Sequence, residues 1–274
     1  MVQAVRQQLG TSYTADDAQH AAGSGVAALL TLPSGSLVFV KGQRGRSPAT
    51  TSTAAEAEAS WWGPDWSPVD ELDLEEAVNP YLPLSAPRVL WRLNTHGWNI
   101  LAFEGLPGRD AEYTPGSPDL TPVAEALAEL ATVTAPALRL PTAWDRWGYY
   151  CTPDDHERLT GRNLLHTDPA STNIVVNKGR AHLVDWSWPA VGPAWIDATL
   201  WGMRLISTGG HTPEAAWAWA SRVPGWSAAD PKSLAAFARA EARRWRDLAA
   251  EQVPTAAAIG EAADAWADAI AART

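Results

Sequence analysis

The sequence predicts an α+β fold in which strands come first and helices form most of the remainder. Two β-prone runs, 24–41 and 98–103, lie in the first 104 residues. A Gly- and Pro-containing break follows at 104–108, and the later chain carries alanine-rich segments with Trp, Leu and Phe at helical spacing. This order indicates a smaller β-rich part followed by a larger, mainly helical part.

Composition limits the possible functions. The chain has 274 residues, 46% of them hydrophobic, which is enough for one large domain or two lobes. Its net charge of −10 argues against nucleic-acid binding and weakly favours a cationic substrate. No apolar run reaches the roughly 18 residues of a membrane span, and the first residues lack the apolar core of a signal peptide. With Cys151 as the single cysteine, we expect a cytoplasmic protein without nucleic-acid or membrane partners.

The first β-prone run reads as two strands joined by a turn at 33–36. The second strand ends in Lys41, one of three lysines in a chain with 18 arginines. This rarity favours a binding role for Lys41 over a solvated strand end. The chain has no G-x-x-x-x-G-K-[ST] motif, and the only nearby candidates for a phosphate-binding glycine loop are Gly23 with Gly25 and the turn at 33–36.

Two helix starts follow. A capping box at 53–56 predicts a short helix within the polar segment 42–66. A second helix begins with Ser67 as its N-cap and Pro68 in the first position, and it ends near Asn79. Beyond the strand at 98–103, a helix begins at Asp119 or Thr121, and further helices are expected over 213–222, 231–250 and 255–272.

The stretch LLHTDPASTNIVVNKGRAHLVDW, residues 164–186, carries the strongest signal. Two short apolar runs flank Asn177-Lys178-Gly179, a turn sequence, and this predicts a hairpin. The hairpin's open end then brings together Asn173, Asp185 and the preceding Asp168. Each of these residues alone is more often a turn former, but together their oxygens suit Mg²⁺ with substrate phosphates.

The pattern H-x-D-x-x-x-x-N, followed by a hairpin and an Asp, resembles the catalytic loop and metal-binding Asp of the protein-kinase-like fold. Asp185-Trp186 and the following VGPAWIDATLW resemble the aminoglycoside phosphotransferase family, and the preference for arginine favours its actinobacterial type. The position where protein kinases usually carry a Lys is Ala170, which argues against a protein substrate. The resemblance covers about residues 24–250 and is closest over 164–201.

The resemblance implies a bilobal protein-kinase-like fold. Residues 1–104 would form the nucleotide-binding lobe, with 42–66 as an insertion that could cover the nucleotide or the acceptor. Residues 105–274 would form the catalytic and substrate-binding lobe. The break at 104–108 would be the hinge, whose backbone binds adenine.

It also implies the roles of the site residues. Asp168 would accept the proton of the attacking hydroxyl, Asn173 and Asp185 would hold Mg²⁺, and Lys41 would position the α- and β-phosphates of ATP. GTP remains an alternative to ATP.

A helix Glu would pair with Lys41. We expect Glu76, with Glu56 as the rival. His166 would brace the loop, and Asp197 would support it from behind or face the acceptor.

The implied function is ATP-dependent transfer of the γ-phosphate to a hydroxyl of a small molecule, first of all an aminoglycoside-like or other antibiotic. A kinase of a metabolic alcohol of the choline, homoserine or sugar type is the alternative within this class. A nucleotide-binding pseudokinase without turnover is the alternative outside it.

Overall fold

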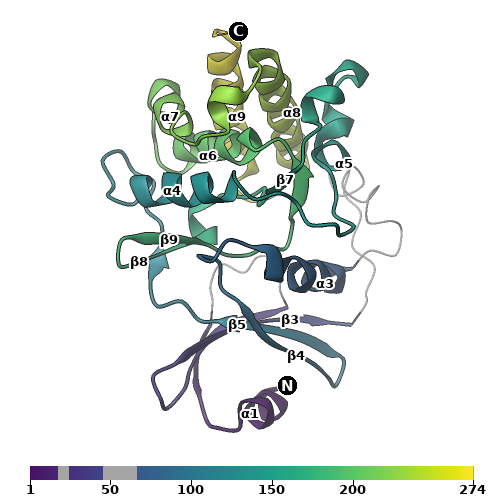
Figure 1. Ribbon diagram of the computed structural model, residues 1–274, viewed down its shortest axis with the longest axis vertical. Helices are drawn as coiled ribbons and strands as arrows, with labels where there is room; N and C mark the ends of the chain where they lie inside the picture. Colours follow the sequence, from purple (N-terminus) through teal and green to yellow (C-terminus); the bar gives the residue numbers. More distant parts are fainter. Residues whose placement is uncertain (18–24, 46–66, 274) are drawn as a thin grey trace.

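The structure is a computed structural model that describes residues 1–17, 25–45 and 67–273. An antiparallel sheet forms the N-terminal part and helices form most of the rest, as the sequence predicts (Figure 1). The sheet runs in the order β1-β2-β3-β5-β4. Its strands are β1 (Thr14–Asp17), β2 (Val26–Thr31), β3 (Leu37–Arg44), β4 (Val89–Thr95) and β5 (Trp98–Glu104). The capping box at 53–56 and Gly23 lie outside the described residues.

Both faces of this sheet are covered by helices. In β5, Ile100 and Ala102 join an apolar cluster that includes Val5 of helix α1 (Val2–Leu9). The intervening residues Leu101 and Phe103 pack with α3 (Pro68–Val78) on the other face. Figure 1 shows α1 and α3 on opposite sides of the sheet. The two-residue period of a strand therefore divides β5 between two small cores.

The same period fixes the direction of Lys41. In β3, Val38 and Val40 contact the cluster on the α1 side, and Phe39 packs on the α3 side. Lys41 lies two residues beyond Phe39, so it points to the α3 side as well. Helix α3 begins as predicted, with Ser67 as the N-cap and its backbone N–H donating to Asp70 Oδ2 at 2.8 Å.

The C-terminal part is built around one large apolar core. Its helices are α4 (Leu120–Leu130), α5 (Ala143–Trp147), α6 (Trp195–Ser207), α7 (Pro213–Ala220), α8 (Pro231–Ala250) and α9 (Ala256–Ala271). The three late helices predicted from alanine-rich segments are confirmed. Many of the tryptophans are core residues, and Trp147, Trp201 and Trp266 are among the most buried side chains. Within the described ranges, none of the helices has both the length and the apolar character to cross a membrane.

Short strands carry the loops of this part. β7 (Asn163–Leu165) pairs with β10 (Ala190–Gly192). β8 (Ile174–Asn177) lies between β9 (Arg180–Leu183) and β6 (Arg109–Asp110) in a second small sheet. Because β6 follows β5 closely in the chain, this pairing attaches the segment after the main sheet to the β8–β9 hairpin.

An ion pair fixes the chain between β6 and α4. The Asp119 carboxylate accepts hydrogen bonds from Arg109 Nη1 at 2.5 Å and Nη2 at 3.0 Å, and from the Glu112 backbone N–H at 2.9 Å. The hydrogen bonds of Arg109 lower the pKa of Asp119 from its ordinary value of 3.8. The stabilising contribution is therefore complete above this value and is lost as the pH falls through the lower folded-state pKa.

We expect Asp119→Asn to lower the melting temperature at pH 7 by about 2–4 °C, because paired, charge-assisted hydrogen bonds are lost. The difference from the unchanged protein should shrink as the pH falls below 3.8. Thermal unfolding at pH 7, 5 and 3 measures this, with the exposed Asp154→Asn as control. A difference that persists undiminished at pH 3 would show that the charge of Asp119 is not the cause.

Candidate active site

The hairpin predicted from the sequence is present. β8 pairs with β9 in register Asn177↔Arg180, and the turn residues Lys178 and Gly179 have φ of 49° and 75°. At the open end, the Val184 backbone N–H donates to the Asn173 carbonyl at 2.9 Å. Asn173 and Asp185 therefore flank this end of the hairpin.

The loop before the hairpin is held from behind by a buried carboxylate in the first turn of α6. Asp197 accepts the backbone N–H groups of His166 at 2.9 Å and Thr167 at 2.7 Å. His166 Nε2 contacts the Val184 carbonyl at 2.8 Å, and its Nδ1 accepts from the Asp168 N–H at 3.3 Å. One ring nitrogen is thus engaged within the loop and the other by Val184 after β9, which agrees with the predicted bracing role of His166.

Thr167 holds an unfavourable backbone conformation, with φ of 73° in a β-branched residue. Its backbone N–H donates to Asp197. Its hydroxyl donates to the Trp188 carbonyl at 2.6 Å and accepts from Arg146. These bonds offset a strain of about 1–3 kcal/mol. The backbone conformation of Thr167 in turn sets the direction in which the side chain of the next residue, Asp168, points.

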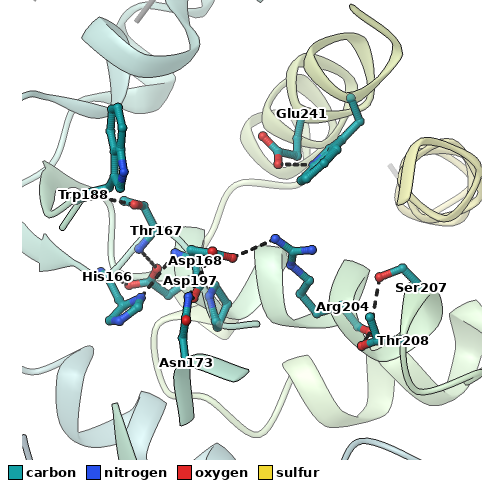
Figure 2. A network of polar contacts seen from close by, with 12 residues as sticks. His166, Thr167, Asp168, Asn173, Trp188, Asp197, Arg204, Ser207, Thr208 and Glu241 are labelled. Carbon is teal, nitrogen blue, oxygen red and sulfur yellow. Dashed lines mark hydrogen bonds and ion pairs between the residues drawn. The ribbon is translucent and has the colours of Figure 1, made fainter. Parts of the chain in front are cut away.

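Asp168 has two side-chain partners. One carboxylate oxygen accepts from Asn173 Nδ2 at 3.0 Å, and the other accepts from Arg204 Nη2 at 2.7 Å (Figure 2). The Asp168 side chain keeps 43% of its surface exposed, so solvent or a substrate can reach it. Sequence reasoning missed Arg204. The available signal was its position seven residues after Asp197, which places both residues on one face of a helix.

Asn173 and Asp185 can supply oxygen ligands to a metal ion. The Asn173 nitrogen donates to Asp168, which leaves its carboxamide oxygen for another contact. Burial alone would raise the pKa of Asp185, but the charge of Lys41 and the hydrogen bonds from Lys41 and Ser187 together outweigh it and lower that pKa. Among residues 1–17, 25–45 and 67–273, no group of three or more His, Cys, Asp or Glu could hold a metal. Two protein oxygens suit Mg²⁺ that keeps phosphate and water ligands.

Lys41 connects the sheet to this site. Its Nζ donates to both carboxylate oxygens of Glu75, at 3.0 and 2.9 Å, and to Asp185 Oδ1 at 2.6 Å. Burial opposes the charge on Lys41, but the two carboxylates outweigh it and raise the pKa of the ammonium group. Glu75 also accepts the Trp186 backbone N–H at 3.0 Å. Sheet, α3 and the Asp185 loop therefore meet at one buried ion pair.

The prediction that Glu76 pairs with Lys41 is wrong, because the partner is the preceding residue, Glu75. Glu76 accepts from Arg92 Nη1 at 2.7 Å, and its side chain is 39% exposed. Glu75 lies three residues after Leu72, on the helix face that packs against the sheet, whereas the next residue is rotated by about 100°. The rival candidate, Glu56, lies outside the described residues.

A pocket of about 330 Å³ lies between the sheet and the hairpin. Lys41, Glu75, Asn173 and Asp185 line it on the polar side. Its apolar lining includes Leu29, Phe39, Phe103, Leu106, Val175 and Val184. An apolar slot for a base, with a cation and two oxygen ligands beside it, fits a nucleoside polyphosphate with a divalent metal ion.

The predicted hinge also lines the pocket, through Glu104, Leu106 and Gly108. A side chain at Gly108 would come within 2.6 Å of the Val176 carbonyl, so the backbone passes β8 closely. The structure thus brings together Lys41, Asn173, Asp168 and Asp185, adds Glu75 and Arg204, and leaves Glu76 outside.

Three features define the protein-kinase-like fold. A strand Lys of an antiparallel sheet pairs with a Glu of a neighbouring helix, the sheet is joined to a helical part, and that part carries the loop with Asp168 and Asn173. No family model matches the sequence, and no curated protein sequence matches it. Solved structures do match, and they include aminoglycoside phosphotransferases and related small-molecule kinases. The prediction of this fold is therefore confirmed.

Three of these structures illustrate the likeness. An aminoglycoside phosphotransferase in complex with ADP and hygromycin B is 13% identical, with 98% of both chains covered and a TM-score of 0.57. The choline kinase of Streptococcus pneumoniae is 11% identical over 98% of this chain and 96% of its own, with a TM-score of 0.57. An amicoumacin kinase in complex with AMP-PNP, Ca²⁺ and Ami is 13% identical over 96% of this chain and 93% of its own, with a TM-score of 0.53.

Proposed function

We propose that this protein is an ATP-dependent phosphotransferase that moves the γ-phosphate to a hydroxyl of a small molecule. The observation that carries the proposal is the chain of contacts along the pocket. Lys41 contacts Asp185 at 2.6 Å, and Asn173, at the other side of the hairpin's open end, contacts Asp168 at 3.0 Å. Nucleotide positioning, metal binding and proton acceptance would thus lie side by side.

The apolar slot would take the adenine ring, beside the hinge at 104–108. Lys41, held by Glu75, would bind the α- and β-phosphates. The Asn173 oxygen and Asp185 would hold Mg²⁺, which when bound neutralises charge on the phosphates. Nucleotides in the neighbouring folds, ADP in one and AMP-PNP with Ca²⁺ in another, support this use of the site.

Asp168 would accept the proton of the acceptor hydroxyl and orient its oxygen toward the γ-phosphate. A carboxylate has about four lone-pair positions, so Asp168 can bind a hydroxyl while it keeps Asn173 and Arg204. The strained Thr167 and buried Asp197 would keep it in place. Division of the chain near residue 105 into nucleotide-binding and acceptor-binding lobes belongs to the same proposal.

An antibiotic is the first acceptor to test, because antibiotic phosphotransferases are among the structural neighbours. A metabolic alcohol is the second, since a choline kinase shares the fold. The presence of Lys41, Asp168, Asn173 and Asp185 together argues against a pseudokinase, because the usual mark of an inactive kinase is the loss of one of these groups.

The test is incubation of the purified protein with Mg²⁺, ATP and a panel of hydroxylated antibiotics and metabolic alcohols. We expect ADP to form and one acceptor to gain the mass of a phosphate. Bound ATP with no ADP above the protein-free background, across the whole panel, would favour the pseudokinase alternative.

A further inference from the structure

Arg204 of α6 is a charged residue beside Asp168, the proposed base, where the acceptor would bind. Its Nη2 donates to Asp168 at 2.7 Å, and only 12% of its side chain is exposed. Figure 2 shows the guanidinium group reaching from α6 toward Asp168. In the described part of the chain, Asp168 is the only hydrogen-bond or ion-pair partner of this guanidinium.

The side chain rests on a rigid support. The guanidinium carbon lies 5.2 Å from the centre of the Trp245 ring, which covers one of its faces. Trp245 Nε1 and Trp147 Nε1 each donate to the buried Glu241 carboxylate at 2.6 Å. Glu241 therefore holds both indole rings in place. Since the Trp245 ring covers a face of the Arg204 guanidinium, the edge of the guanidinium is the side that a ligand can reach.

That edge still has donors to offer. A guanidinium carries five N–H donors in one plane, and Asp168 takes one of them. The remaining donors match a carboxylate, sulfate or phosphate group, which guanidinium binds along its edge.

The distance to the reacting group is short. A hydroxyl bound to Asp168 would lie about 5–8 Å from the guanidinium, allowing for one hydrogen bond and the width of the carboxylate. This is within one Debye length of about 8 Å, whereas the charges that give the chain its net −10 are spread over the whole sequence. The Asp168 carboxylate offsets part of this positive charge, so the unused N–H donors of the guanidinium should decide which groups are tolerated next to the hydroxyl.

We propose that Arg204 is a specificity-determining residue that binds an anionic group of the acceptor, close to the hydroxyl that is phosphorylated. The acceptor class is then a hydroxylated acid, such as a sugar acid or hydroxycarboxylate, and not a polycationic aminoglycoside. This inference rests on the proposed phosphotransferase function.

The test compares related acceptors that carry a negative charge, no charge or a positive charge. One series is glucuronate, glucose and glucosamine; the other is glycerate, glycerol and aminopropanediol; hygromycin B represents polycationic acceptors. With Mg²⁺ and ATP, kcat/KM should be highest for the acid of at least one series. In Arg204→Gln, the preference for that acid over its neutral counterpart should fall by about 10- to 100-fold, the effect of one charge-assisted hydrogen bond.

The matched control is Arg222→Gln, because Arg222 also stacks on a tryptophan, Trp219, at 3.9 Å but is exposed and has no contact with Asp168. This variant should keep the acid preference. A neutral or cationic best acceptor, ADP formation that no acid stimulates, or an unchanged preference in Arg204→Gln would overturn the inference and leave the phosphotransferase function standing. No ADP formation with any acceptor or with water would instead overturn the function itself.

Discussion

Asp168→Asn should lower kcat for phosphate transfer by about 10²–10⁴-fold while the KM for ATP stays nearly constant. The amide has the shape of the carboxylate, and its oxygen can still accept from Arg204, but its nitrogen cannot accept from Asn173 and it cannot take up the hydroxyl proton. Because the Asp168 side chain is 43% exposed, the fold should tolerate the change. Steady-state kinetics with the best acceptor, together with a thermal unfolding curve, separates loss of catalysis from loss of structure.

Asp268→Asn is the matched control, since Asp268 is an exposed carboxylate on α9, in the C-terminal helix. It should leave both kcat and KM unchanged. An Asp168→Asn protein with near-normal turnover would remove Asp168 from the role of base and leave proton acceptance to another group or to solvent.

Glu75→Gln and Glu76→Gln should differ strongly although the two residues are neighbours. The Glu75 side chain is 3% exposed and is bonded to Lys41 and the Trp186 backbone, so loss of its charge breaks a buried ion pair. We expect the free energy of unfolding to fall by about 3 kcal/mol. Glu76 forms a half-exposed pair with Arg92, and its change should cost less than about 1 kcal/mol.

Urea unfolding of both variants measures these costs, and ATP titration adds a second readout. Glu75→Gln should weaken ATP binding, because Lys41 would then lose one of its two carboxylate partners and keep only the other, Asp185. Equal effects of the two substitutions, on unfolding or on ATP affinity, would contradict the assignment of Glu75 as the partner of Lys41.

The hairpin and its polar ends could be predicted from sequence because the signals there are local. The turn at Asn177-Lys178-Gly179 fixes the register, and register places Asn173 and Asp185 at the same end. The signal for helix α3 is equally local, since Ser67 and Pro68 mark the start of this helix. The alanine-rich helices near the C-terminus followed from the helical period of their large apolar residues.

Other features depend on contacts that spacing alone does not encode. Glu75 and Glu76 are both plausible on a helix until the position of the sheet is known, because the choice depends on which face packs against Leu101 and Phe103. The contact between Arg204 and Asp168 joins residues 36 positions apart, and only the packing of α6 behind the loop creates it. Strand β1 was missed because its residues, Thr14–Asp17, are mostly polar, and helix α1 was missed although Val5 and Leu9 follow the helical period.

The division of β5 between two cores makes strand alignment a condition for the proposed nucleotide binding. If β3 slipped by one residue along β5, every side chain of β3 would move to the opposite face of the sheet. Lys41 would then point into the apolar cluster beside α1. Glu75 would then be a buried charge without its counter-ion. A misaligned molecule could be compact and helical yet unable to bind ATP, so titration of ATP-binding sites per mole of protein would count the molecules whose sheet is correctly assembled.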